Sequence, residues 1–236
     1  ALFDGKCPLS GEQLGLHTGH LAAFTSFKQI CDAFCAQMEY FASQMMCSLN
    51  CTEKLIGDYG QHIFSSLLLD GCIEQGKDCT HGGAKYNYIG IQGVGAIDVA
   101  DSLTAIRKAV FEDKVITLKD LEIALKDNFD KDQNMRQYLL NQVPKYGNDQ
   151  RQADEMVAWV VEKYCRYLED KPTIRGGHFR PGLFCLSSNT PLGKQVGALP
   201  SGRLSRTPLA DGGISPKHNM DVSGPTAAAK SVASIP

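Results

Sequence analysis

Nine cysteines are the most reactive side chains in this sequence, and four of them fall in two regularly spaced pairs. Cys31 and Cys35 are four residues apart, as are Cys47 and Cys51, in a segment whose apolar residues recur at helical spacing. Each pair lies on one face of a predicted helix, where two thiolates are able to bind one metal ion. The two-residue interval and histidine pair of zinc modules are missing, and the odd total argues against a full disulfide framework. We therefore interpret these cysteines as core residues of a protein in a reducing compartment and predict no metal site.

Other polar groups allow both a functional and a structural interpretation. His81 is a candidate general base because imidazole titrates near neutrality, but a single loop histidine is more often a surface group. Arg175 and Arg203 stand beside glycines, which suits a carboxylate or phosphate ligand as well as an internal salt bridge. Asp211 fits a turn. Gly90–Gly95 lacks the strand, helix and distant acidic residue of a dinucleotide site, so we predict close backbone approach there instead.

These residues need elements to position them, and hydrophobic periodicity predicts mostly helices. Thr25–Gly71 is predicted to form two helices with a break near Gly57–Gly60. Three further helices are predicted: Asp98–Phe111, a helix that Thr117 caps and that continues through Lys126, and Gln152–Leu168. After Lys171 no further helix is expected. Leu183–Leu186 is the best strand candidate, and Arg203–Ala233 shows no helical or strand period, so we interpret it as the wall of a pocket.

Composition limits the class of protein. The chain has 236 residues, of which 43% are hydrophobic and 21% charged, an ordinary globular composition for one domain or part of one. A formal charge of −2 disfavours nucleic acid and anionic membranes as partners. The apolar run Ile63–Leu69 is too short to cross a bilayer, and the first residues lack the pattern of a signal peptide. We predict a cytoplasmic protein.

Three segments together resemble one family. They are Gly82–Glu112, Arg175–Gly193 and Arg203–Ala233, and they are similar to the glycyl radical enzymes, the family of pyruvate formate-lyase, choline trimethylamine-lyase and the B12-independent diol and hydroxyproline dehydratases. The resemblance covers essentially the whole chain. It implies an α/β fold, in which residues 1–236 form a single partial domain: the second, C-terminal half of a ten-stranded α/β barrel, with its surrounding helices.

The resemblance also implies an activity. In this family a partner radical-SAM activating enzyme installs a radical on a backbone glycine, which passes it to a cysteine. The thiyl radical then takes hydrogen from a small substrate, and a C–O, C–N, C–S or C–C bond breaks. The parent is usually a homodimer and binds no other cofactor directly. The radical-bearing glycine segment is not found in this sequence and the catalytic cysteine loop is expected before Ala1, so we predict that this chain alone is inactive.

The resemblance singles out two groups of residues. Gly71–Glu74 reads Gly-Cys-Ile-Glu and matches the letters of the family's catalytic Gly-Cys-x-Glu loop, but it lies downstream of the expected place. We therefore favour a structural Cys72 and assign no catalytic role to Cys72 or Glu74. The residues expected to contact substrate are small or hydroxylated and come from two segments: Thr226, Ala227 and Ala229 first, and Ser188 and Asn189, with Ser187, as a weaker expectation.

Three interpretations of the whole protein stay open. The segments Ala1–Gly15 and Asp70–Asp78 resemble the dehydratase and lyase branch more than pyruvate formate-lyase itself. A fragment of a formate C-acetyltransferase is the first alternative. A non-catalytic binding module, or one half of a split enzyme, is the second. A split enzyme predicts an exposed apolar face along Val94–Ala100 and Leu183–Leu186, where the other half would dock.

Overall fold

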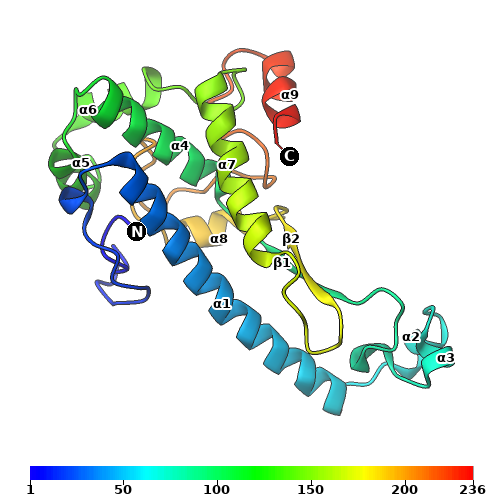
Figure 1. Ribbon diagram of the computed structural model, residues 1–236. Helices are drawn as coiled ribbons and strands as arrows, with labels where there is room; N and C mark the ends of the chain where they lie inside the picture. The colour runs from blue at the N-terminus through cyan, green and yellow to red at the C-terminus, as the bar shows by residue number, and fades with distance from the viewer. Residues whose placement is uncertain (236) are drawn as a thin grey trace. The chain divides into compact units, whose positions relative to one another are not determined.

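The structure is a computed structural model that describes residues 1–235 and divides into two compact units (Figure 1). Unit 1 contains Ala1–Met38, Gln92–Tyr164 and the residues from Leu183 onward. Unit 2 contains Glu39–Ile91 and Cys165–Gly182. Each unit is therefore assembled from segments that are distant in the sequence.

The first part of the chain confirms the predicted pair of helices with a break. A short 3-10 helix, η1 (Leu21–Ala23), precedes the long α1 (Phe27–Tyr59), and α2 (Ile63–Leu67) follows the break. The α1 helix passes through Gly57 and ends just before Gly60, whose N–H closes the last turn on Ile56 O at 2.7 Å. Two short elements complete this region, α3 (Cys72–Gln75) and η2 (Cys79–His81).

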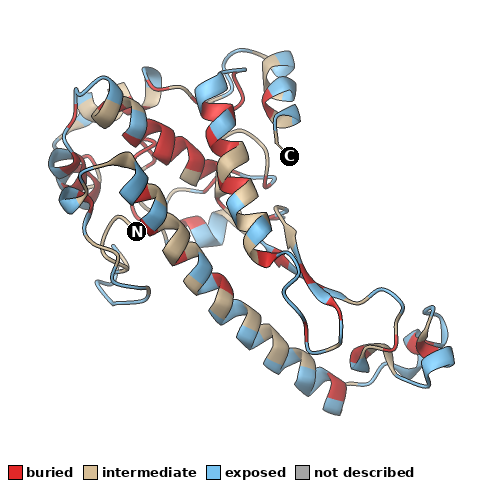
Figure 2. Ribbon diagram, in the orientation of Figure 1, coloured by how far each residue is buried: buried red, intermediate tan, exposed pale blue. Residues whose placement is uncertain are grey.

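The middle of the chain supplies the helices that build the core of unit 1. They are α4 (Ala96–Ile106), the π-helical turn η3 (Arg107–Glu112), α5 (Leu118–Lys126), α6 (Gln133–Asn141) and α7 (Arg151–Leu168). The predicted cap is present, because Thr117 Oγ1 accepts the Asp120 N–H at 3.1 Å. The α6 helix was not predicted. Figure 2 shows α4 buried almost throughout, which fits its apolar composition.

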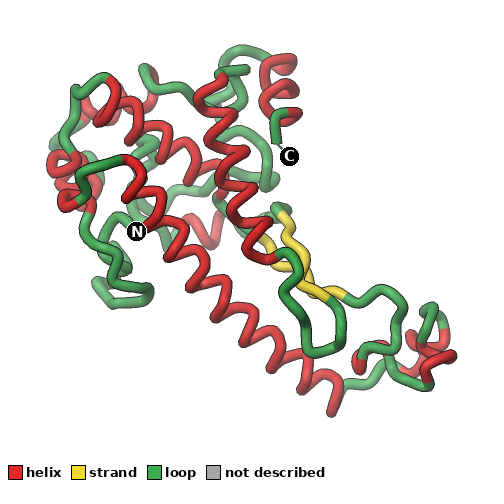
Figure 3. Tube along the Cα trace, viewed as in Figure 1, coloured by secondary structure: helices red, strands yellow, loops and turns green. Residues whose placement is uncertain are grey.

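The two strands of the described residues pair in one sheet. They are β1 (Tyr88–Gln92) and β2 (His178–Gly182), and Figure 3 shows them running beside each other. Neither was predicted, and the strand expected at Leu183–Leu186 is wrong. The chain leaves the extended conformation there: Leu186 has a left-handed φ of 49° and Ser188 N–H closes a turn on Cys185 O at 2.9 Å.

The expectation that helices stop after Lys171 is also wrong. The structure contains α8 (Asn189–Gly193) and α9 (Pro225–Ala233). The α9 helix needs no apolar period to form, because Pro225 has the backbone angle of a first helical residue and three alanines, the strongest helix formers, follow Thr226. The segment that looked like an irregular pocket wall therefore ends in a helix.

Two classes of feature are missing from residues 1–235. None of the helices described there is long and apolar enough to cross a membrane. No group of three or more histidine, cysteine or acidic side chains in that range has the arrangement of a metal site. None of the nine cysteines forms a disulfide. The interpretation of the four paired cysteines as core residues is wrong for Cys47 and Cys51, which are exposed, whereas Cys31 and Cys35 are half-buried. Burial raises the pKa of Cys31 to about 11.

Candidate functional site

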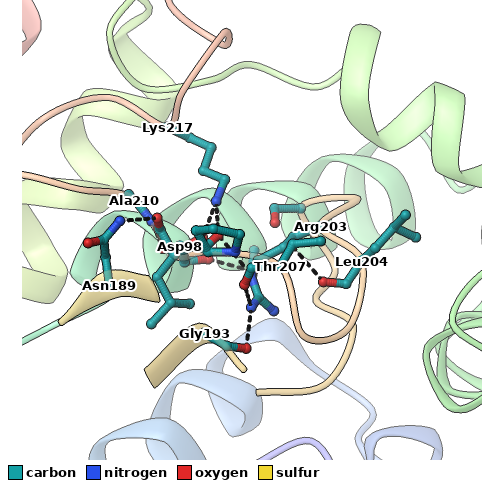
Figure 4. A network of polar contacts seen from close by, with 12 residues as sticks. Asp98, Asn189, Gly193, Arg203, Leu204, Thr207, Ala210 and Lys217 are labelled. Carbon is teal, nitrogen blue, oxygen red and sulfur yellow. Dashed lines mark hydrogen bonds and ion pairs between the residues drawn. The ribbon is translucent and has the colours of Figure 1, made fainter. Parts of the chain in front are cut away.

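A buried arginine organises the loop that follows α8 in unit 1 (Figure 4). Arg203 is 5% exposed, and its guanidinium donates to Gly193 O and Gly197 O, each at 2.8 Å, and to the carbonyl oxygens of Thr207 and Pro208. The predicted internal salt bridge of Arg203 is not found among the contacts of residues 1–235, where its guanidinium binds main-chain carbonyls. The loop is folded around the Arg203 side chain, whose N–H groups bind main-chain carbonyls that are not paired in a sheet.

Asp98 connects this loop to the core helix α4. Its carboxylate is buried, accepts the Ala210 N–H at 2.7 Å, and lies 3.8 Å from Lys217 Nζ, which in turn donates to Pro208 O. Burial raises the pKa of Asp98, while the Ala210 N–H and the charges of Lys217 and Arg203 act in the opposite direction. Burial likewise lowers the pKa of Lys217. The carboxylate therefore fixes both the backbone at residue 210 and the lysine side chain.

One of the predicted substrate-contacting residues, Asn189, belongs to this network. Ser188 and Asn189 begin α8, and Asn189 O accepts the Leu209 N–H at 3.1 Å. The side-chain amide of Asn189 also donates to Leu209 O at 3.5 Å. Both residues are half-buried. Asn189 is therefore held by the backbone of Leu209, next to Ala210, which Asp98 binds.

A second carboxylate follows one helical turn after Asp98. Asp101 is 2% exposed and accepts the Tyr146 N–H at 3.1 Å. Burial raises the pKa of Asp101 to about 6, although the charge of Lys145 acts to lower it. Lys145 is also buried, which lowers its pKa, and its ammonium donates to Leu139 O at 2.8 Å and to Ser201 O at 3.3 Å.

A cavity of about 180 Å³ lies beside these charges. Its walls carry one carboxylate, Asp101, and several cations from different segments: Arg136, Lys145, Arg203, Lys217 and, when protonated, His218. Arg136 also donates to Gly202 O at 3.0 Å. Four of these cations, Arg136, Lys145, Arg203 and Lys217, donate hydrogen bonds to main-chain carbonyls. The charged side chains around the cavity thus hold residues 193–217 in place.

The other predicted substrate-contacting residues lie on α9. Thr226 and Ala229 are exposed and Ala227 is half-buried. The helix is anchored by its later residues: fully buried Ser231 accepts the Asp149 N–H at 3.0 Å, and Lys230 Nζ lies 2.8 Å from Asp149 Oδ2. Within residues 1–235, no hydrogen bond or ion pair connects α8 with α9. The structure therefore gives the two predicted groups separate anchors in unit 1.

The Gly-Cys-Ile-Glu segment forms a helix start in unit 2. Cys72 is the first residue of α3 and is 4% exposed, and burial raises the pKa of its thiol. Glu74 Oε2 accepts the Gly71 N–H at 3.0 Å, so its carboxylate caps the helix. The arrangement fits the structural interpretation of Cys72 that the sequence favours.

The remaining candidates are distributed over both units. Arg175 forms an ion pair with Glu53, with 3.1 Å between Nε and Oε2, so an internal salt bridge is present. His81 ends η2 at an exposed position, and Asp211 is exposed in a turn. Sequence reasoning treated Asp98 only as a helix-start carboxylate and did not single out Asp101, Lys145 or Lys217. Two carboxylates three residues apart within an apolar helix were the available signal.

Comparison with known proteins gives a consistent result. The sequence pattern described as "Pyruvate formate lyase-like" matches residues 1–193. A trans-4-hydroxy-L-proline dehydratase from Clostridioides difficile is 36% identical over 99% of this chain and 30% of its own length. Two solved structures superpose closely: the B12-independent glycerol dehydratase from Clostridium butyricum (38% identity, TM-score 0.95) and a glycyl radical enzyme from Archaeoglobus fulgidus (32%, 0.92).

The extent of these matches is itself informative. The two superpositions cover 99% and 100% of this chain but 29% and 30% of the solved chains. The chain thus spans about 30% of the length of the relatives it matches. The predicted fold class, part of an α/β barrel with surrounding helices, is confirmed by this agreement along the whole chain.

Proposed function

Because the chain belongs to the pyruvate formate lyase-like family, we propose that it is part of a glycyl radical dehydratase, an enzyme that eliminates water from a small hydroxylated substrate. One observation carries this proposal: similarity to dehydratases extends over 99% of the chain at 36–38% identity. Cleavage of a C–N, C–S or C–C bond by the same radical chemistry is the broader form of the proposal.

The parts of the reaction fall on different segments in this proposal. Residues 1–236 form a partial barrel domain, while the catalytic cysteine loop and the glycyl radical domain belong to other segments of the natural protein. A radical-SAM enzyme installs the radical, the parent is a cytoplasmic homodimer, and this chain alone is inactive. The radical supplies hydrogen abstraction, and the protein positions the substrate and shields the reaction from water.

The residues of this chain act by binding and orientation in this proposal. Thr226 offers a hydroxyl that donates and accepts, and Ala227 and Ala229 leave room for substrate. Ser188 and Asn189 form the second set. The buried Asp98 and Arg203 act indirectly, because Arg203 binds the last residue of α8, Gly193, and Asp98 binds Ala210 in the loop that follows. Cys72 and Glu74 take no part.

The alternatives have less support. The apolar face that a split enzyme requires is only partly present: Ile97 and Ala100 are buried, whereas Phe184 and Leu186 are 62% and 72% exposed. The two relatives that are named by their activity, from Clostridioides difficile and Clostridium butyricum, are both dehydratases. We therefore place the dehydratase first.

The test uses the natural protein, activated without oxygen by its radical-SAM enzyme. Glycerol, propane-1,2-diol and trans-4-hydroxy-L-proline are supplied separately, the glycyl radical is quantified by electron paramagnetic resonance, and dehydrated products are measured by mass spectrometry. We expect dehydration of a hydroxylated substrate. Pyruvate with coenzyme A is supplied in a parallel assay. A protein that carries the radical and forms formate and acetyl-coenzyme A there, but dehydrates none of the three hydroxylated substrates, contradicts the dehydratase assignment.

A paired variant tests the assignment of Thr226. Thr226→Ala removes the hydroxyl from an exposed position of a helix that favours alanine, so the fold and the radical yield should be unchanged while KM for the substrate rises. Thr52→Ala, an exposed helical threonine of unit 2, is the matched control. Equal KM values in both variants would remove Thr226 from the substrate contacts.

A further inference from the structure

Unit 2 contains a pocket of about 530 Å³ that the proposed reaction does not use. The volume lies within the range of small-molecule sites. The lining comes from the end of α3 and the residue Lys77 after it, from the segment between η2 and the start of β1, and from the loop before β2 together with β2 itself. It is rich in cations: Lys77, Lys85, Arg175, Arg180 and, when protonated, His178. None of the residues that line it is acidic.

This concentration of positive charge is not expected from the chain as a whole. The sequence has 26 acidic and 24 basic residues, so a neutral mixture is the expectation for any patch. Only Arg175 has an acidic partner, Glu53. In the described part of the chain, Lys77, Lys85 and Arg180 form no ion pair, and all three are exposed. The pocket therefore presents three uncompensated charges to solvent, and concave walls of low dielectric concentrate their field.

The walls are rigid because glycines let main-chain segments touch. A Cβ on Gly177 would stand 1.5 Å from Asn87 O, and one on Gly82 would stand 2.3 Å from Arg175 O. The side-chain amide of Asn87 donates to Arg175 O at 3.2 Å across the same contact. These contacts lock the loop that carries Lys85 against the loop that carries Arg175, which lowers the entropy cost of holding a ligand beside them.

Two aromatic rings add a second property. Tyr86 and Tyr88 line the pocket and are 77% and 60% exposed, so the pocket carries flat apolar surface beside its charges. Exposed tyrosines in a binding site supply stacking surface at low entropy cost. Guanidinium and ammonium groups together match phosphate or carboxylate oxygens.

We propose that this pocket binds a small organic polyanion, a ring-bearing molecule with two or more phosphate or carboxylate groups. The negative groups lie between Lys77, Lys85 and Arg180, and the ring lies against Tyr86. The site is distinct from the residues proposed to contact the dehydratase substrate, which all belong to unit 1. The ligand is therefore a second molecule, and its binding does not require the radical.

The experiment measures binding to the natural protein, without activation, by isothermal titration calorimetry. Pyrophosphate and citrate are the first two probes and separate phosphate from carboxylate recognition. ADP is the third, because it adds a ring to a diphosphate. We expect at least one inorganic or organic anion to bind, and ADP to bind more tightly than pyrophosphate. No binding of any probe at millimolar concentration overturns the proposal.

Variants distinguish this pocket from general attraction. Lys77→Glu with Lys85→Glu should weaken anion binding about tenfold to a hundredfold, since each charge-assisted hydrogen bond is lost and replaced by repulsion. Lys119→Glu, an exposed lysine of α5 in unit 1, is the matched control and should bind as the natural protein does. Equal weakening in the control overturns the site.

A third variant tests the ring. Tyr86→Ala should weaken ADP binding and leave pyrophosphate binding unchanged. If ADP and pyrophosphate weaken equally, the ring-bearing part of the proposal is overturned. Because activity plays no part in these measurements, their failure leaves the dehydratase assignment standing, and failure of the dehydratase assay leaves this site standing.

Discussion

The two units treat positive charge in opposite ways. In unit 1, Arg203 and Lys145 are buried, and their N–H groups donate hydrogen bonds to main-chain carbonyls. In unit 2, Lys77, Lys85 and Arg180 line an open pocket without an acidic partner. A cation that saturates carbonyls maintains the fold, and a cation that faces solvent in a rigid pocket remains available to a ligand. The following changes test that distinction.

The largest effect is expected where the unit 1 loop meets the backbone before α8. Gly213 has a φ of 78°, and a Cβ there would stand 1.3 Å from Leu183 O. Gly213→Ala should lower the free energy of unfolding by more than about 3 kcal/mol, because the main chain must move. Gly11→Ala has a similar φ of 76° with nothing within 4 Å, so it isolates the cost of the backbone angle, about 1 kcal/mol. Denaturant unfolding compares the two, and equal losses would refute the steric argument.

Arg203→Lys tests the loop through its central side chain. The charge is kept, but a single ammonium is unable to reach carbonyls on both sides of the loop as the guanidinium does. We expect a loss of about 2–3 kcal/mol in the free energy of unfolding. Arg206→Lys, at an exposed position of the same loop, should leave the stability unchanged. Both variants are compared by thermal unfolding. A neutral Arg203→Lys would show that the charge alone holds the loop.

Asp101 should make the free energy of unfolding depend on pH. Its pKa is about 6 in the native protein against an ordinary 3.8, so the native state binds more protons than the unfolded chain between about pH 4 and pH 6. Stability contributed by this group is therefore present at about pH 4 and falls, by up to about 3 kcal/mol, as the pH rises to 6.

Asp101→Asn keeps an acceptor for the Tyr146 N–H and removes the titration. We expect the thermal midpoint of the variant to fall less than that of the natural protein between pH 4 and pH 6. Asp211→Asn, an exposed carboxyl, is the control for general effects of charge. A slope that stays unchanged in Asp101→Asn would assign the pH dependence to other groups.

The smallest effect is expected in unit 2. Lys77→Gln and Lys85→Gln remove exposed charges that have no ion pair, so the free energy of unfolding should change by less than about 0.5 kcal/mol. The measurement is thermal unfolding of each variant at low and high salt. A clear loss of stability would show that these lysines stabilise the fold, as Arg203 does, and would contradict the difference between the two units.

The sequence allowed the long helices to be predicted because their signals are local. Apolar spacing indicated α1 and α7, and the Thr117 cap marked the start of α5. The strands β1 and β2 were missed because each is five residues long and its partner lies far away in the sequence. The α9 helix was missed because alanines form a helix without an apolar stripe.

The candidate site was less predictable for a related reason. Guanidinium chemistry suggested a carboxylate or phosphate ligand, or a salt bridge, for Arg203, whereas its acceptors are carbonyls of the main chain, which have no signature in the sequence. Asp98 was recognised as a helix-start residue, whereas its bond to the Ala210 N–H joins residues 112 positions apart. Resemblance supplied Thr226 and Asn189, and the structure places them on helices with different anchors.

The way Arg203 is bound has a consequence for how this loop tolerates variation. Its acceptors are the carbonyls of residues 193, 197, 207 and 208, and every amino acid carries a carbonyl. Exchanging the side chains at positions 207 and 208 leaves those acceptors in place, whereas inserting or deleting one residue moves them all. In a library of random variants, the loop would therefore accept many amino-acid substitutions as long as Arg203 is kept. It would accept almost no insertion or deletion.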